Sequence, residues 1–183
     1  MAQAFEELIG SFMDDLYSAA ICFTLDEHLA EELLQEASIR AFHEFPRVQR
    51  RADLRHLMLA LLVSTYLQRR RRQGHDPLAP DSGLYGEVEG TVPQQQVGQF
   101  PEHGTPRYRL LLNWAGHFWS QLDDGDRLVL WLADVERLRH RRVAEMTGLG
   151  VEEVRARHYR ARRALGQGAA RELGRRAYGG VEA

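Results

Sequence analysis

The chain has 183 residues, a formal net charge of −2 at pH 7 and one cysteine, Cys22, and its basic residues other than histidine are all arginine. A single cysteine excludes a disulfide framework and a cysteine-rich zinc site, and it favours a reducing compartment, so we expect a cytoplasmic protein. The longest apolar run, 57–63, is too short to span a bilayer, and no membrane partner is expected.

Charge is separated along the chain. Residues 1–46 hold one arginine against ten acidic residues, whereas 47–73 hold eight arginines against one acidic residue. Residues 74–106 are acidic without any arginine, 107–134 are nearly neutral, and 135–183 hold twelve arginines against six acidic residues. The pattern predicts an acidic face for one partner and basic faces for another, such as a polyanion, although solvated helix faces would give the same counts.

The first part of the chain has the pattern of three helices. Apolar residues recur at helical spacing from Phe5 to Phe23 and predict one helix. Asp26 is a candidate N-cap for a second helix, 29–45, which Pro46 ends. A third helix is predicted over 52–72, where the apolar centre LMLALLV gives way to QRRRR.

A linker follows these helices. Residues 74–106 contain most of the prolines and many glycines, and we expect them to lack regular structure because they have too few apolar residues to offset the entropy of ordering. The predicted fold is therefore all-α, with two small helical domains, 1–73 and 107–168, on a flexible tether. A C-terminal tail, 169–183, completes the chain.

The second domain has the pattern of a helix-turn-helix. Helical segments are expected at 107–122 and 126–138, and a short helix at 140–148 precedes an arginine-rich helix at 151–166. The residues that would face inward on the last helix are Val154, His158, Ala161 and Leu165. A plain helical hairpin with a solvated arginine face is the alternative.

Two segments resemble one protein family. LDDGDRLVLWLADVERLRHRRVAEMTGLGVEEVRARHYRARRALG, 122–166, resembles region 4 of the extracytoplasmic-function (ECF) sigma factors. AEELLQEASIRAF, 30–42, is similar to region 2 of the same family, and the two segments follow in the family's order. The resemblance implies that the chain binds core RNA polymerase, at the clamp of the largest subunit and at the flap. It also implies promoter DNA and an anti-sigma factor as partners.

The resemblance also implies site residues. In region 2, the positions that would dock on the polymerase clamp are Glu32, Gln35, Glu36 and Arg40. The candidates for the minus-10 element are Arg50, Arg51, Arg55, His56, Arg69 and Arg70. In region 4, the positions that would face the minus-35 element are Arg155, Ala156, Tyr159 and Arg160, with phosphate contacts from Arg141, Arg142, Arg162 and Arg163.

The chain departs from the family at three places. Where the promoter-melting helix is rich in aromatic and basic residues, 57–64 reads LMLALLVS, which puts base capture in doubt. Glu152 and Glu153 replace a Gly-Thr pair; they suit the helix N-terminus but would repel phosphate. His158 stands at an aliphatic position, and we expect it to be partly buried and hydrogen-bonded.

Three functions compete. The first is a sigma factor that directs promoter-specific initiation, and the second is a sigma-like interaction protein that no longer opens promoters. The third, an unrelated helix-turn-helix repressor, leaves 30–42 unexplained. The sequence has no phosphate loop, nucleophile elbow or metal-ligand spacing, so we expect no enzyme, no metal and no cofactor.

Overall fold

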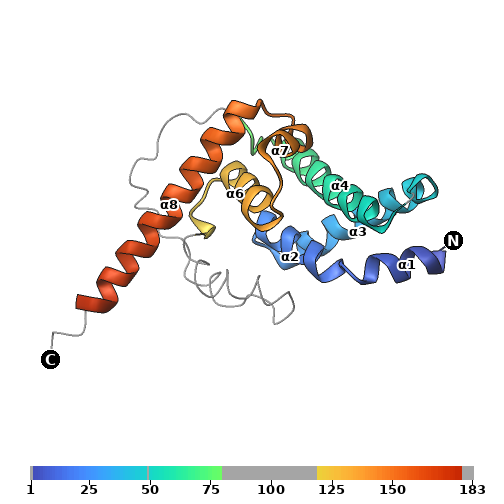
Figure 1. The fold of residues 1–183 in the computed structure, drawn as a ribbon, viewed down its shortest axis with the longest axis horizontal. Coiled ribbons are helices and arrows are strands. Elements are labelled where there is room, and N and C mark those ends of the chain that lie inside the picture. The colour runs from blue at the N-terminus through green and yellow to red at the C-terminus, as the bar shows by residue number, and fades with distance from the viewer. Residues whose placement is uncertain (1, 49, 80–118, 179–183) are drawn as a thin grey trace.

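The computed structural model describes residues 2–48, 50–79 and 119–178, and these ranges are helical with no strand (Figure 1). The predicted all-α class is confirmed. Most of the expected linker, 80–106, and most of the helix expected at 107–122 lie outside the described residues. The described start of the linker, 74–79, forms turns without regular structure, as expected.

The predicted first helix is two helices, α1 (Ala2–Gly10) and α2 (Met13–Thr24). The hydroxyl of Ser11 donates to the carbonyl of Leu8 at 2.7 Å, a local bond that competes with the helical ladder directly after Gly10. The side chain of Phe12 stays in the core at 5% exposure. Periodicity could not show this break, because the apolar stripe continues across it.

The second and third helices follow the predicted pattern closely. Asp26 caps α3 (Glu27–Glu44), since its Oδ1 accepts a hydrogen bond from the amide of Leu29 at 2.9 Å. Pro46 lies in a short 3₁₀ turn, η1 (Phe45–Arg47), that ends this helix. The third helix is α4 (Arg51–Arg72).

The apolar run of α4 is explained by burial on more than one side. The helix packs against α2 and α3, and also against α7 (His140–Thr147) from the second half of the chain. Met58, Leu59, Leu62 and Val63 are each no more than 1% exposed. Half of the run 57–64 that departs from the melting-helix pattern is thus core, and its other four residues are half-buried.

The second half consists of α6 (Asp124–Leu130), a π-helical turn η2 (Trp131–Val135), α7, and α8 (Val151–Tyr178). The last helix continues to Tyr178 instead of ending at 166. Residues 169–178 of the expected C-terminal tail are therefore helical. The corner between η2 and α7 contains Arg137 with φ of 54°, a left-handed conformation that is uncommon outside glycine.

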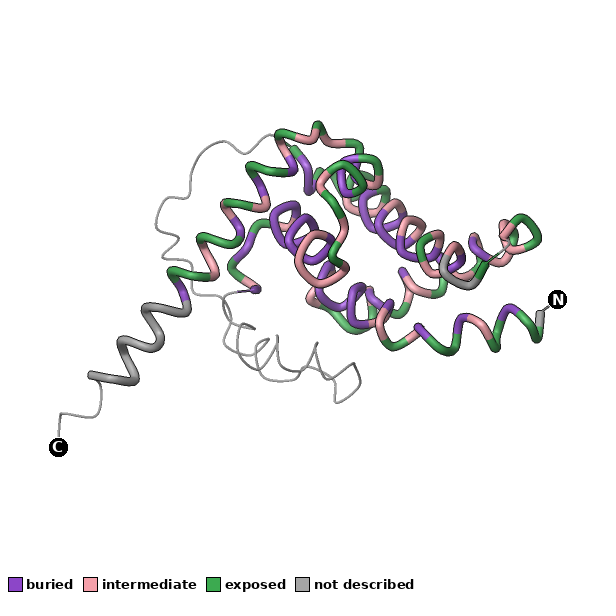
Figure 2. The backbone as a smooth tube through the Cα atoms, viewed as in Figure 1, coloured by how far each residue is buried: buried purple, intermediate pink, exposed green. Residues whose placement is uncertain are grey.

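The two halves share one hydrophobic core in the described residues (Figure 2). The indole nitrogen of Trp119 donates to the carbonyl of Cys22 at 3.2 Å, and the rings of Phe23 and Trp131 meet edge to face with centroids 6.4 Å apart. Arg127 donates to the carbonyl of Phe23 at 3.3 Å. This interface was not anticipated from sequence; the domain boundaries at 73 and 107 remain a prediction.

Candidate nucleic-acid interface

The helix-turn-helix is built from α7, a tight corner and the first turns of α8. Gly148 has φ of +78°, which glycine adopts at little cost, and its amide donates to the carbonyl of Ala144 at 2.9 Å. The hydroxyl of Thr147 donates to the carbonyl of Val143 at 2.8 Å. Val143 and Val154 are fully buried between the two helices, which fixes the angle at which α8 leaves the corner.

One face of α8 is exposed. Arg155, Ala156, Tyr159 and Arg163 lie on it, as helical spacing predicts. Tyr159 is 67% exposed, and Arg155 forms an exposed ion pair with Glu152 at 2.8 Å. Glu152 is thus an intrahelical partner of the arginine and stands at the helix N-terminus, where its charge is favourable.

Arg160 differs from the expectation of a fully exposed position. Its guanidinium contacts both carboxylate oxygens of Asp126 in α6, at 3.2 and 3.4 Å, and its side chain is 32% exposed. Asp126 is completely buried. The contact turns Arg160 toward the protein because a buried carboxylate needs a cationic partner.

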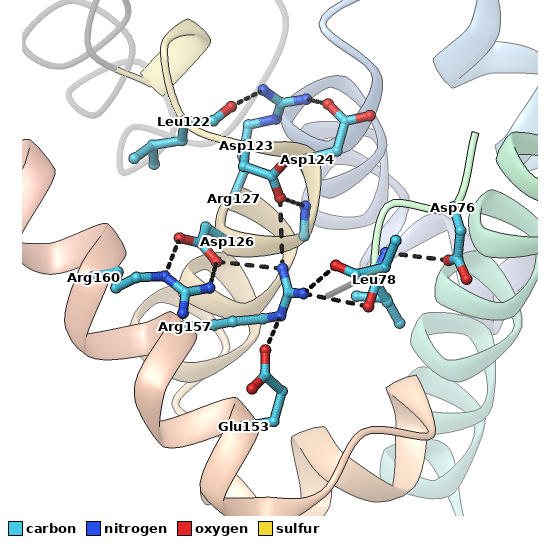
Figure 3. A network of polar contacts seen from close by, with 12 residues as sticks. Asp76, Leu78, Leu122, Asp123, Asp124, Asp126, Arg127, Glu153, Arg157 and Arg160 are labelled. Atoms are coloured by element: carbon cyan, nitrogen blue, oxygen red, sulfur yellow. Dashed lines mark hydrogen bonds and ion pairs between the residues drawn. The ribbon is translucent and has the colours of Figure 1, made fainter. Parts of the chain in front are cut away.

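Arg157 was missed by sequence reasoning altogether. It is 1% exposed and lies at the centre of the network in Figure 3, with Glu153 at 2.8 Å and Asp126 at 3.5 Å. Its Nη2 also donates to the carbonyls of Leu78 and Ala79 at 3.3 and 2.8 Å. The only sequence signal is its place three residues after the inward-facing Val154.

A chain of polar side chains joins α7, α8 and η2. The Nε2 of His140 lies 2.9 Å from the Nδ1 of His158, whose Nε2 lies 3.0 Å from the carboxylate of Asp134. His158 is therefore partly buried and hydrogen-bonded, as expected. Burial holds the pKa of His140 below its ordinary 6.5, and the electrostatic effects of His158 and Arg155 act in the same direction, although Asp134 acts in the opposite direction.

The remaining phosphate candidates are exposed but paired. Arg142 contacts Glu145 at 2.9 Å, and Arg141 lies 3.9 Å from the same carboxylate. Arg162 contacts Asp134 at 2.7 Å, so Asp134 serves both this arginine and His158. Exposed pairs of this kind exchange partners at small cost, because each contributes only about 0–1 kcal/mol.

The polymerase candidates on α3 divide into two groups. Gln35 is exposed, and the neighbouring Ile39 is 56% exposed, an unusual value for a large apolar side chain. Glu32 and Glu36 both bind the guanidinium of Arg69 on α4. Arg40 donates to the hydroxyl groups of Ser64 and Thr65, so its contacts are with α4.

The minus-10 candidates are mostly engaged within the protein. Arg55 contacts Glu136 at 2.9 Å, and Arg70 contacts Asp124, so two of them pair with carboxylates of the second half. Arg69 is held by α3 as described above. Arg50 pairs with Asp53 at 3.1 Å, and His56 is exposed. The side chain of Arg51 lies outside what the structure describes.

One comparison identifies the helix-turn-helix segment. Residues 119–165 match the protein family described as Sigma-70, region 4. The match spans α6, η2, α7 and the first half of α8, or 47 of the 183 residues, and it supports a sigma-like role in DNA binding and transcription. Within the described ranges, no group of side chains could hold a metal ion. No helix in those ranges could cross a membrane.

Proposed function

We propose that this protein is an ECF-type sigma factor, which binds core RNA polymerase and directs transcription from its own promoters. The observation that carries the proposal is the exposed face of α8 with Arg155, Ala156 and Tyr159, within the segment that matches region 4. An arginine fork pairs with the O6 and N7 of guanine in the major groove, and small or apolar side chains fit the methyl group of thymine.

The basic residues around that face suit the phosphate backbone. Arg141 and Arg142 stand at the start of α7, the helix that crosses the backbone in this motif, and Arg163 stands further along α8. Releasing counterions from phosphates at such positions gives affinity that falls with salt. Base reading is assigned to α8, and positioning to the start of α7.

The proposed polymerase contact is the face of α3 around Gln35 and Ile39. An exposed isoleucine beside half-exposed carboxylates has the composition of a docking surface, with an apolar centre and a charged rim. The proposed receiver is the clamp of the largest subunit, with the flap as the partner of region 4. An anti-sigma factor is a further proposed partner.

A second candidate function is a sigma-like protein that binds polymerase or an anti-sigma factor without opening promoters. Burial of Met58, Leu59, Leu62 and Val63 favours it, since strand capture draws on exposed aromatic and cationic groups. Base capture in a true sigma factor would then need residues outside this run, such as the exposed His56.

The test compares Arg155→Ala with Arg47→Ala. Each arginine is exposed and pairs with a glutamate three residues earlier, so the two variants remove the same kind of ion pair. Promoters are first found by transcribing genomic fragments with core polymerase and the wild-type protein. Arg155→Ala should weaken promoter binding by about 1–3 kcal/mol and Arg47→Ala should not. Polymerase binding without any transcript would select the second function. No polymerase binding would reject the sigma factor and leave only the anti-sigma form of the second function.

A further inference from the structure

We propose that the cleft where α2, α3, α4 and α6 meet binds a small molecule that carries one aromatic ring and a carboxylate. None of the residues that line the cleft belongs to the exposed face of α8, and neither Gln35 nor Ile39 is among them. The inference does not depend on the proposed function, because a ligand site of this kind would stand even if the protein bound no polymerase.

The inner part of the cleft is a cavity of about 60 Å³ with largely apolar walls. One buried water occupies roughly 10–15 Å³ on the same measure, so the space suits about four to six non-hydrogen atoms, or one six-membered ring. Its apolar walls come from Phe23, Leu29, Leu33 and Tyr66. The rings of Phe23 and Tyr66 lie with centroids 5.8 Å apart, and a third ring beside them would gain favourable aromatic contacts.

An outer cavity of about 420 Å³ adjoins the inner one and is lined mostly by polar residues. The two cavities share Thr24, Leu29, Arg70 and Asp124, which form the junction between them. A ligand whose ring fills the inner cavity would therefore hold its polar group at the junction. Specific ligand sites commonly combine an apolar pocket with a few convergent polar groups in this way.

Cations outnumber carboxylates at the junction. Arg70, Arg127 and His75 all contact the single carboxylate of Asp124. Arg127, seen beside Asp124 in Figure 3, has a side chain that is only 4% exposed. Two guanidinium groups that stay charged share one carboxylate, so the junction favours a ligand with a negative charge.

The other acidic residues of the outer cavity serve as helix caps. Asp26 caps α3 by accepting a hydrogen bond from the amide of Leu29, and Asp123 caps α6 by accepting one from the amide of Gly125. Their negative charges are favourable at these helix N-termini. The positive charge beside Asp124 is thus left for a ligand.

Three buried donors around the junction have no hydrogen-bond partner among the residues that the structure describes. They are the hydroxyl of Tyr66, the Nε of Arg70 and the Nε of Arg127. Burial, and after it the charge of Asp124, raises the pKa of the Tyr66 hydroxyl, which therefore stays protonated. Asp124 is itself bound by both arginines.

A ligand carboxylate would supply the acceptor oxygens that these donors lack. A buried donor without an acceptor costs free energy, and a charged acceptor makes a stronger hydrogen bond than a neutral one. The side chain of Arg70 is 34% exposed, so its guanidinium can turn toward a ligand at the junction. The ring and the carboxylate of the ligand are thus specified by different parts of the cleft.

The probe is benzoate, which is tested on the full chain beside two related molecules. Benzamide keeps the ring without the charge, and acetate keeps the carboxylate without the ring. Benzoate should bind with a dissociation constant of about 1 mM, as suits so small a ligand, and should raise the melting temperature. Benzamide and acetate should each bind about tenfold more weakly or worse. Ligand-observed NMR and thermal melts measure both effects.

Tyr66→Phe tests the donor at the junction. It should weaken benzoate binding by about tenfold, because a hydrogen bond to a charged group is lost. It should not lower the melting temperature, since the hydroxyl has no partner in the described residues. The control is Tyr17→Phe, which removes a hydroxyl that donates to Glu27 at 3.2 Å outside the cleft. Benzoate affinity should be unchanged there.

Leu29→Trp tests the space itself, because Leu29 lines both cavities and a larger side chain would fill them. It should abolish benzoate binding. Leu34→Trp, at another half-buried leucine of α3 that does not line the cleft, should leave it intact. Circular dichroism identifies a tryptophan variant that loses helix, and Tyr66→Phe then decides.

Four results would overturn the proposal. One is the absence of saturable benzoate binding up to about 10 mM, a concentration well above the dissociation constant expected for a ligand of this size. Another is equal binding of benzamide, which would remove the charge requirement, and a third is equal binding of acetate, which would remove the ring. The last is unchanged benzoate affinity in both Tyr66→Phe and Leu29→Trp, which would place the binding outside the cleft.

Discussion

Asp126 and Arg157 meet as two fully buried side chains, with Oδ1 and Nη1 3.5 Å apart. Removing one partner of a buried pair leaves the other charge without compensation, which is costly. Arg157 also donates to the backbone carbonyls of Leu78 and Ala79, so it joins α6, α8 and the residues after α4 in one network. Stability and the relative position of the two halves therefore depend on the same guanidinium.

Arg157→Met should lower the free energy of unfolding by about 3–5 kcal/mol. The reason is that Glu153, Asp126 and the backbone carbonyls of Leu78 and Ala79 lose their donor together. Urea denaturation followed by circular dichroism measures the change. Arg163→Met, at an exposed position of the same helix, should change it by less than about 0.5 kcal/mol. Equal effects of the two substitutions would contradict the network's importance.

Arg160→Ala and Tyr159→Ala should separate folding from DNA recognition. Arg160→Ala should lower stability, because Asp126 keeps fewer donors, and Tyr159→Ala should not, because Tyr159 is 67% exposed. Tyr159→Ala should instead weaken promoter binding. Thermal melts and fluorescence anisotropy on the same two proteins decide, and a stable Arg160→Ala with no DNA affinity would restore that arginine as a direct reader.

Stability should depend on the protonation of His140. Its pKa is lowered in the folded protein, so its contribution is fully present above pH 6.5 and is lost as pH falls from there through the folded pKa. The protonated ring is disfavoured by its partial burial and by the nearby charge of Arg155. The difference in unfolding free energy between pH 7.5 and pH 5 should shrink in His140→Gln. An unchanged difference would mean that other titratable groups control the pH dependence of the unfolding free energy.

Docking on polymerase should depend on Ile39 and Gln35. Ile39→Asp should weaken binding to core polymerase, because truncating the apolar centre of an interface costs about 2 kcal/mol or more. Gln35→Arg should weaken it by placing a positive charge on a face whose rim is acidic. Both side chains are exposed, so the melting temperature should hold. Glu36→Arg is a poor test, since it would place two guanidinium groups together at Arg69. Normal binding by both variants would mean that the polymerase contact lies on a surface other than this face of α3.

Relief of the left-handed residue between η2 and α7 should stabilise the protein. Arg137→Gly should raise the free energy of unfolding by up to about 1 kcal/mol, because the strain of φ 54° exceeds the extra backbone entropy of glycine. Chemical denaturation measures it. Arg137→Val, which tolerates this conformation least, is the opposite control and should be destabilising. A loss in the glycine variant would show that the arginine side chain makes a compensating contact.

Local features were predictable from the sequence. Asp26 caps α3, Gly148 adopts the left-handed turn, and Val154 and Ala161 face inward, because each depends on residues a few positions away. The break at Ser11 was not predictable from an apolar stripe that runs through it. The burial of Arg157 was missed because its partners include the carbonyls of Leu78 and Ala79, and backbone atoms leave no trace in residue identity.

The site was predicted less completely than the fold. The exposed positions of Arg155 and Tyr159 agree with helical periodicity, which is a local property. The partners of Arg55, Arg70 and Arg160 are carboxylates brought close only by the tertiary fold, over separations that no motif covers. A basic residue on a helix can face solvent or a buried carboxylate, and the amino-acid type alone does not distinguish the two environments.

The core shared by Phe23, Trp119 and Trp131 has a consequence for how this protein could be recombined. Halves that touch only through a tether can be exchanged between homologues as modules. Here a transplanted second half would lose the carbonyls of Cys22 and Phe23, which accept hydrogen bonds from Trp119 and Arg127. It would also lose residues 76–79, whose Pro77 carbonyl packs against Gly125. Chimaeras joined within 80–118 should therefore fold poorly unless both halves come from the same parent.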